Sequence, residues 1–298
     1  MSNEAILMLL VLAPLVGSLA LPLLGSFSPR LRNMVSLLLV AVSLGAALRL
    51  VPVVLSGAVV SVNFNFGFGS NILLADRLAV FMAIVSSLVG AIIVLYSFDY
   101  ISHYENQNEY YFMVVLFLGS MMGLVFAANL IVLYVCWELT AIASWRLIGF
   151  FRERQHVIRA DKAFMVTFFG AVLMLLGFVI VQQQSGSFDM PVIKEFFRTH
   201  SVANLAVLLI LLGLLSKSAT LPLQTWLPDA GVAPSPVTAL LHAAVLVKIG
   251  VYAFARLLVV TLPISDAWHT LVPAVAAISA LVAAGAALIE TDIKRIIA

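Results

Sequence analysis

Charged residues are scarce in this sequence of 298 residues: Asp, Glu, Lys and Arg together make up 10% of it, whereas soluble domains carry about 25%. The formal net charge is only +2, which argues against a nucleic-acid partner because binding to phosphates needs a basic surface. Hydrophobic residues make up 63% of the chain, more than a water-soluble globule of this length could bury. The composition therefore argues against a soluble enzyme and against disorder, and it indicates a polytopic helical protein in a lipid bilayer.

Cysteine occurs once, at Cys136, which excludes a disulfide framework, a Cys-rich zinc site and an Fe–S cluster held by this chain alone. Of the five histidines, only His242 lies deep in an apolar stretch, so we expect no haem held between two histidines of this chain. The sequence has no dinucleotide-binding fingerprint either. We therefore expect no cofactor, no metal and no redox site in this chain.

Nine apolar stretches are long enough to cross a bilayer at about 20 residues each. They show no two-residue alternation, which argues against a membrane β-barrel. The stretches fall at 5–25, 33–53, 78–98, 111–127, 129–150, 163–182, 202–225, 235–260 and 267–289. A tenth begins at Thr291, and the segment from Asn63 to Asn71 is rich in residues that form breaks. The sequence therefore predicts an all-α transmembrane bundle of about nine to ten spans.

Basic residues favour the inner side of a membrane. If the N-terminus lies outside, the inner side carries eight of them: Arg30, Arg32, Arg152, Arg154, Arg159, Lys162, Lys294 and Arg295. The outer side then carries five: Arg49, Arg77, Lys194, Arg198 and Arg256. We therefore predict that the N-terminus faces outside.

Three charged residues lie deep within apolar stretches: Glu138, Lys217 and Lys248. Glu138 is nine residues past Asn129, or about 13 Å along a helix that crosses a core of about 30 Å. Each such charge costs at least about 2.5–3.5 kcal/mol on insertion scales. A structural Glu–Lys pair would explain one lysine, but one carboxylate cannot neutralise two. The second lysine, with His242 six residues before it, favours a proton relay.

Span seven combines a buried lysine with a break. Pro222 follows Lys217 by five residues and removes a backbone donor, so we expect the helix to be interrupted between Ser218 and Leu223. Broken helices at membrane depth are tolerated where protein or water lines the gap. A lysine beside such a break is typical of an ion pathway.

Several ordered motifs resemble those of one known superfamily. They are Trp137–Thr140 with Leu147–Phe150, Lys217–Ala219 with Trp226–Ala230, Pro234–Ala244, and Asp292–Ala298. In order and spacing they are similar to the antiporter-like subunits of respiratory complex I, of the L or chain 5 type. The large subunit of Mrp cation/proton antiporters and subunits of membrane-bound hydrogenases are related to these. The resemblance covers nearly the whole chain.

The resemblance implies a subunit built from two inverted repeats, each of five helices with one broken. By it, residues 1–98 are three N-terminal helices, 111–260 the first repeat with its broken seventh helix, and 267–298 the start of a truncated second repeat. It also implies that Glu138 and Lys217 switch between closed and open states, and that His242 and Lys248 relay the proton onward. The family's members are longer, so we expect an N-terminal portion or half of a split subunit, with a C-terminal partner missing.

Two further departures from the family pattern matter. Trp145 and Arg146 replace the apolar pair usual after the glutamate, and Arg146 either reaches the inner surface or gates proton entry. The surroundings of Lys248, from Leu246 to Tyr252, resemble the Mrp and hydrogenase versions more than many complex I chains. The transported ion, proton or sodium, stays open.

Our leading prediction is a proton-translocating membrane subunit of a complex I-like NADH-quinone oxidoreductase in an energy-transducing membrane such as the bacterial inner membrane. Any redox chemistry would reside on partner subunits, so the term enzyme, here a translocase coupled to electron transport, applies only to the complex. The alternatives are a subunit of a multi-subunit Mrp-type Na⁺/H⁺ antiporter or the membrane subunit of an energy-converting hydrogenase. The three buried charges argue against a purely structural scaffold.

Overall fold

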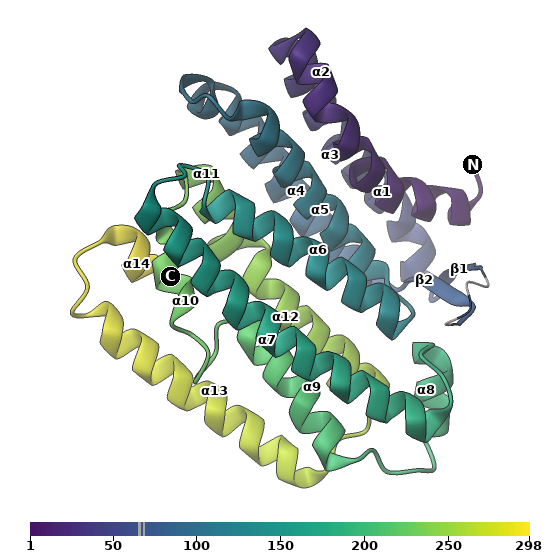
Figure 1. Ribbon diagram of the computed structural model, residues 1–298. Helices are drawn as coiled ribbons and strands as arrows, with labels where there is room; N and C mark the ends of the chain where they lie inside the picture. The colour runs from purple at the N-terminus through teal and green to yellow at the C-terminus, as the bar shows by residue number, and fades with distance from the viewer. Residues whose placement is uncertain (65–66, 68) are drawn as a thin grey trace. The chain divides into compact units, whose positions relative to one another are not determined.

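The computed structural model describes residues 1–64, 67 and 69–298, with the backbone alone at 243 and 244 (Figure 1). Among these residues, eight helices are long and apolar enough to cross a membrane. They are Asn3–Phe27, Pro29–Leu55, Arg77–His103, Gln107–Phe126, Leu130–Ile148, Arg154–Ser185, Ser235–Thr261 and Asp266–Ala287. Each overlaps one of the nine predicted stretches. The protein is thus a polytopic helical membrane bundle.

The expected count of nine to ten spans is too high by this measure. The seventh stretch holds α9 (Asn204–Lys217), which has 14 residues, and at about 1.5 Å per residue it is about 21 Å long, short of a core of about 30 Å. The tenth stretch holds only α14 (Ile293–Ile297). In the described part of the chain, eight helices of spanning length and one shorter apolar helix thus stand in place of nine to ten spans.

The chain divides into two compact units, Met1–Phe150 and Phe151–Ala298, and each is described by itself. The boundary lies within the segment 111–260 that the resemblance assigns to one repeat. The grouping into 1–98, 111–260 and 267–298 stays a prediction.

The first unit is arranged around α5, because 83% of the residues in the apolar stretch of this helix are buried. Side-chain oxygens cap the starts of four of its helices: Ser2, Ser28, Asp76 and Asn129 each accept a backbone N–H of the first turn. Helix α5 packs against α1, α3, α4 and α6. The helices of the unit are α1 (Asn3–Gly17), α2 (Leu21–Phe27), α3 (Pro29–Leu55), α4 (Arg77–Tyr100), α5 (Gln107–Phe126) and α6 (Leu130–Ile148).

The β-structure among the described residues is a short antiparallel hairpin in the first unit. Strands β1 (Val60–Asn63) and β2 (Asn71–Ala75) pair with an irregular register at Asn63. The hairpin is attached to the α5–α6 junction because the backbone N–H of Ala128 donates to the carbonyl of Ile72 at 2.9 Å. We expected only a break from Asn63 to Asn71, and part of that break, residues 65, 66 and 68, lies outside the described residues.

In the second unit α9 packs against both α7 and α12 (Figure 1). Helix α13 runs along the edge of this unit (Figure 1). None of the residues in its most apolar stretch is buried. Two π-helical segments, Ala239–Ala244 and Ala255–Thr261, flank α12. The remaining elements are α7 (Arg154–Ser185), α8 (Met190–Phe196), α10 (Trp226–Asp229), α11 (Ser235–Thr238), α12 (Leu246–Phe254) and α13 (Asp266–Ala287).

Candidate functional site

The four predicted relay residues belong to two units. Glu138 lies on α6 in the first unit, nine positions after the Asn129 cap, and one of its carboxylate oxygens is buried. Lys217, His242 and Lys248 lie in the second unit. Because each unit is described by itself, the pairing of Glu138 with Lys217 stays a prediction.

Lys217 is the last residue of α9, and its side chain is completely buried, with 0% of its surface exposed. The helix ends in a turn of the Schellman type: Ala219 adopts φ 51°, and the N–H of Thr220 donates to the carbonyl of Leu215 at 3.0 Å. The carbonyl end of a helix carries partial negative charge, which favours a cation there. The local structure thus places the lysine where part of the cost of burying its charge is offset.

The predicted interruption of span seven is confirmed, and it is longer than expected. The chain is non-helical from Ser218 to Thr225, and α10 begins at Trp226. The left-handed Ala219 ends the helix three residues before Pro222, so the proline prevents renewed helix rather than ending α9. The indole N–H of Trp226 donates to the carbonyl of Ser216 at 2.9 Å, which satisfies one of the carbonyls left at the helix end.

Helix α12 approaches the end of α9 at Gly250. A Cβ atom at this position would lie 2.8 Å from the carbonyl oxygen of Leu214 and 2.9 Å from the backbone nitrogen of Ser218. Such distances are too short for a side chain, so glycine allows the two backbones to touch. Lys248 is half-buried and lies two residues before Gly250, so it and the buried Lys217 are on helices in direct contact.

His242 lies within the π-helical segment Ala239–Ala244 and is 6% exposed. Its two ring nitrogens are buried and have no hydrogen-bond partner in the described part of the chain. The Lys248 ammonium donates to the backbone carbonyl of His242 at 3.1 Å. Two residues six positions apart do not share one helical face, so a contact between them needs water or the long lysine stem. The stem does make it, to the carbonyl and not to the imidazole.

Arg146 has a partner that the sequence did not reveal. Its guanidinium pairs with Glu109, in the first turn of α5, with an Nε–Oε1 distance of 2.7 Å. It also lies against the ring of Trp145, 5.5 Å from the centroid. The two charges are 37 positions apart in the sequence, so hydropathy along one span could not have linked them.

Two arginines that we counted as flanking charges are buried. Arg32, 2% exposed, donates to the amide oxygens of Asn108 at 2.6 Å and Gln107 at 2.9 Å, and its guanidinium lies 4.6 Å from the centroid of the Tyr111 ring. Arg256, 6% exposed, donates to the hydroxyl of Tyr252 at 2.8 Å. Both are close to helix ends, where the sequence does not distinguish an arginine that reaches water from one that turns inward.

Among residues 1–64, 67 and 69–298, no three His, Cys, Asp or Glu side chains are grouped as ligands for a metal ion. The expectation of no cofactor in this chain stays a prediction.

Comparison with known proteins gives two family matches. Residues 127–298, more than half of the chain, match the family described as NADH:quinone oxidoreductase/Mrp antiporter, TM. Residues 59–111 match the family described as NADH-Ubiquinone oxidoreductase (complex I), chain 5 N-terminus. The Na(+)/H(+) antiporter subunit A1 of Staphylococcus aureus is 34% identical over 304 residues, a match that covers 99% of this chain and 38% of that protein. The chain thus spans under two fifths of the length of the curated relatives it matches.

Two solved structures share the fold. A chain in the Mrp complex from Dietzia sp. DQ12-45-1b superimposes with a TM-score of 0.85 at 28% identity, covering 97% of this chain and 32% of that one. A chain in the membrane-bound sulfane sulfur reductase, an archaeal respiratory membrane complex, gives 0.89 at 23% identity, covering 99% and 62%; it supports the fold alone. Taken with the family matches, this confirms the resemblance: the chain belongs to the NADH:quinone oxidoreductase/Mrp antiporter transmembrane family.

Proposed function

We propose that this chain is an ion-translocating membrane subunit of a multi-subunit antiporter of the Mrp type, and that it carries protons through Glu138, Lys217, His242 and Lys248. Our leading expectation from the sequence was a complex I-like NADH-quinone oxidoreductase. The relatives named as Na⁺/H⁺ antiporter subunit A1 and the likeness to the Mrp complex favour the alternative. In either assembly the N-terminus would face outside and the chain would hold the first of two inverted repeats.

The observation that carries the proposal is the complete burial of Lys217 at the end of a helix that stops part-way along its span. A structural ion pair does not require the helix to stop. A break of this kind is typical of an ion pathway, because it lets carbonyls, hydroxyls and water reach the charge. The hydroxyls of Ser218 and Thr220, 3.2 Å apart, lie directly after the lysine.

The contact between α9 and α12 supports an onward path. Lys248 is fixed by its bond to the carbonyl of His242, and the imidazole ring keeps both nitrogens without a partner among the described residues. An imidazole of this kind can accept and donate a proton through water. We infer that a proton leaving Lys217 passes through His242 or water to Lys248.

The test compares two variants of Lys217 in the assembled complex. Lys217→Arg keeps a charge that cannot be lost at accessible pH, and Lys217→Met removes it. A relay predicts that both variants assemble and that both lose Na⁺-driven proton movement in vesicles. Lys194→Met is the matched control, since Lys194 is an exposed lysine of the same unit. Native proton movement in the assembled arginine variant would reject the relay.

The same vesicles distinguish the two assemblies. An Mrp-type antiporter moves protons when a Na⁺ gradient is imposed, without an electron donor. Proton movement that requires electron transfer to quinone, and that a Na⁺ gradient does not drive, would restore the complex I-like reading.

A further inference from the structure

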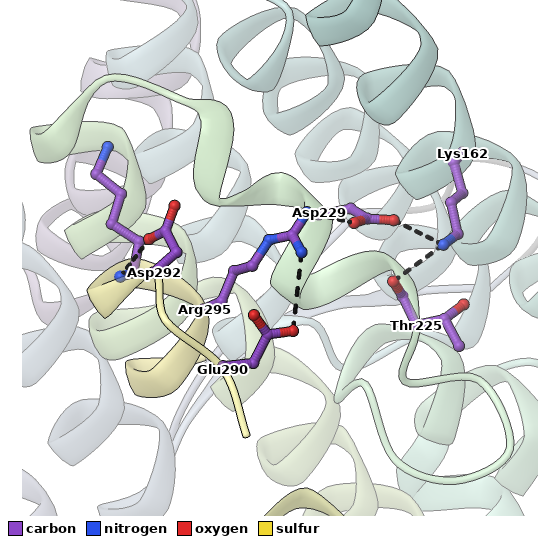
Figure 2. A network of polar contacts seen from close by, with 7 residues as sticks. Lys162, Thr225, Asp229, Glu290, Asp292 and Arg295 are labelled. Carbon is purple, nitrogen blue, oxygen red and sulfur yellow. Dashed lines mark hydrogen bonds and ion pairs between the residues drawn. The ribbon is translucent and has the colours of Figure 1, made fainter. Parts of the chain in front are cut away.

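An ion cluster surrounds Asp229, the last residue of α10 (Figure 2). One carboxylate oxygen lies 2.7 Å from the ammonium of Lys162 on α7, and the other lies 3.4 Å from the guanidinium of Arg295 on α14. Arg295 in turn lies 3.7 Å from Glu290. We call these four residues the Asp229 cluster. Asp229 thereby joins elements that are more than sixty positions away on either side.

Lys162 of the cluster, and Lys294 next to Arg295, also bind the backbone on either side of α10. The ammonium of Lys162 donates to the carbonyl of Thr225 at 3.1 Å, just before the helix. The ammonium of Lys294 donates to the carbonyl of Ala233 at 2.8 Å, just after it. The segment from Thr225 to Ala233 is thus fixed by basic residues of α7 on one side and of α14 on the other.

A short path leads from this cluster to the buried lysine. Asp229 lies three residues after Trp226 on the single turn of α10. Trp226 is 0% exposed, and its indole donates to the carbonyl of Ser216, the neighbour of Lys217. A displacement of α10 would therefore move the group that holds the end of α9.

We propose that Asp229 is a positioning residue for Lys217: it draws Lys162 and Arg295 together, fixes α10, and through the Trp226 indole holds the end of α9 in its place. This inference rests on the proposed function. An ordinary exposed ion pair would not have this role, and the same unit contains one for comparison, Arg198 with Glu195, whose side chains are 68% and 72% exposed. The side chain of Asp229 is 26% exposed and is shared by two cations, which makes the geometry specific.

The first experiment measures Na⁺-driven proton movement by the assembled complex carrying Asp229→Asn. The amide has nearly the shape of the carboxylate but carries no charge, and it has an acceptor oxygen for only one of the two cations. We expect the turnover to fall roughly 10-fold, because a displacement of about 1 Å at a transfer group costs up to 10²-fold, while the KM for Na⁺ and the amount of assembled complex stay unchanged. Asp229→Glu should restore part of the turnover. Glu195→Gln, the control at the exposed pair, should leave turnover unchanged.

The second experiment tests the path through the indole. Trp226→Phe keeps the ring and removes the N–H donor, and we expect the same loss of turnover. Trp268→Phe is the matched control: Trp268 is also buried, and its indole donates to Asn204 at the start of α9, at 3.1 Å. If Asp229 acts through Trp226, the double variant Asp229→Asn with Trp226→Phe should lose no more turnover than either of these single variants.

The outcomes separate this inference from the proposed function. Native turnover in Lys217→Met would overturn the relay itself. Loss of turnover at Lys217 together with native turnover in Asp229→Asn would overturn the positioning role alone. If Asp229→Asn fails to assemble, Trp226→Phe decides the question, and native turnover in that variant rejects the path.

Discussion

The contact between α9 and α12 makes Gly250→Ala a sharp test of the packing around Lys217. The added methyl carbon would lie 2.8 Å from the Leu214 carbonyl oxygen and 2.8 Å from the Ser218 Cβ. Two of the three nearest atoms belong to the backbone, so no rotamer change relieves the clash and one helix must move. Overpacking of this kind costs about 1–3 kcal/mol. Alanine also gains roughly 0.5–1 kcal/mol of helix propensity over glycine, which leaves a net destabilisation of about 1 kcal/mol at the middle of the two ranges.

Thermal unfolding of the purified protein measures this difference. At about 2–4 °C per kcal/mol, Gly250→Ala should lower the Tm by roughly 2–4 °C. Gly285→Ala is the matched control, since it lies in α13 of the same unit and an added Cβ has nothing within 4 Å. We expect that control to unfold at the native temperature or slightly above it. Equal Tm values for the two variants would refute the close approach of the two helices.

Two further predictions concern the first unit. Glu138→Gln removes the charge of a half-buried side chain with little change in volume, so the complex should assemble while proton movement falls. Full proton movement in the assembled variant would remove Glu138 from the relay. Glu105→Gln, at an exposed carboxylate, is its control. The pair of Arg146 and Glu109 is about 30% exposed on both sides and is therefore screened, so a double-mutant cycle of Arg146→Gln and Glu109→Gln in thermal unfolding should give a coupling of about 1 kcal/mol or less. If Arg146→Gln impairs transport strongly although this stability coupling is small, the result would favour the gating role of Arg146 over a purely structural one.

The spans could be predicted from the sequence because a lipid core imposes a long apolar run on each helix that crosses it. The interruption of span seven was also predictable, since Pro222 excludes helix locally. The position at which α9 ends was not, because Ala219 adopts a left-handed conformation that its residue type does not favour. The helix end is also contacted by residues beyond it, among them the Trp226 indole, which donates to the Ser216 carbonyl.

Charges near helix ends were the least predictable part. Arg32 and Arg256 lie in positions where arginines usually reach water, yet amide oxygens and a tyrosine hydroxyl hold them inside the protein. In the Asp229 cluster, one carboxylate binds Lys162, which is 67 positions away, and Arg295, which is 66 positions away. Periodicity and hydropathy describe one segment at a time, so they locate charges without identifying their partners.

The energetics of Lys217 show why its partners matter. Burying an ammonium at membrane depth costs at least about 2.5–3.5 kcal/mol, and the carbonyl end of a helix offsets about 0.3–2 kcal/mol. Roughly 0.5–3 kcal/mol must therefore come from other groups around the ammonium, by the difference of these two ranges. This remainder is small enough for the displacement of one carboxylate or one water to reverse it, since an ion pair near 4 Å is worth about 4 kcal/mol at an effective dielectric constant of 20. In the proposed relay, a lysine at a helix end whose charge is stabilised by groups that can move fits a proton carrier, whereas a lysine locked in a structural pair would gain nothing from the break that follows it.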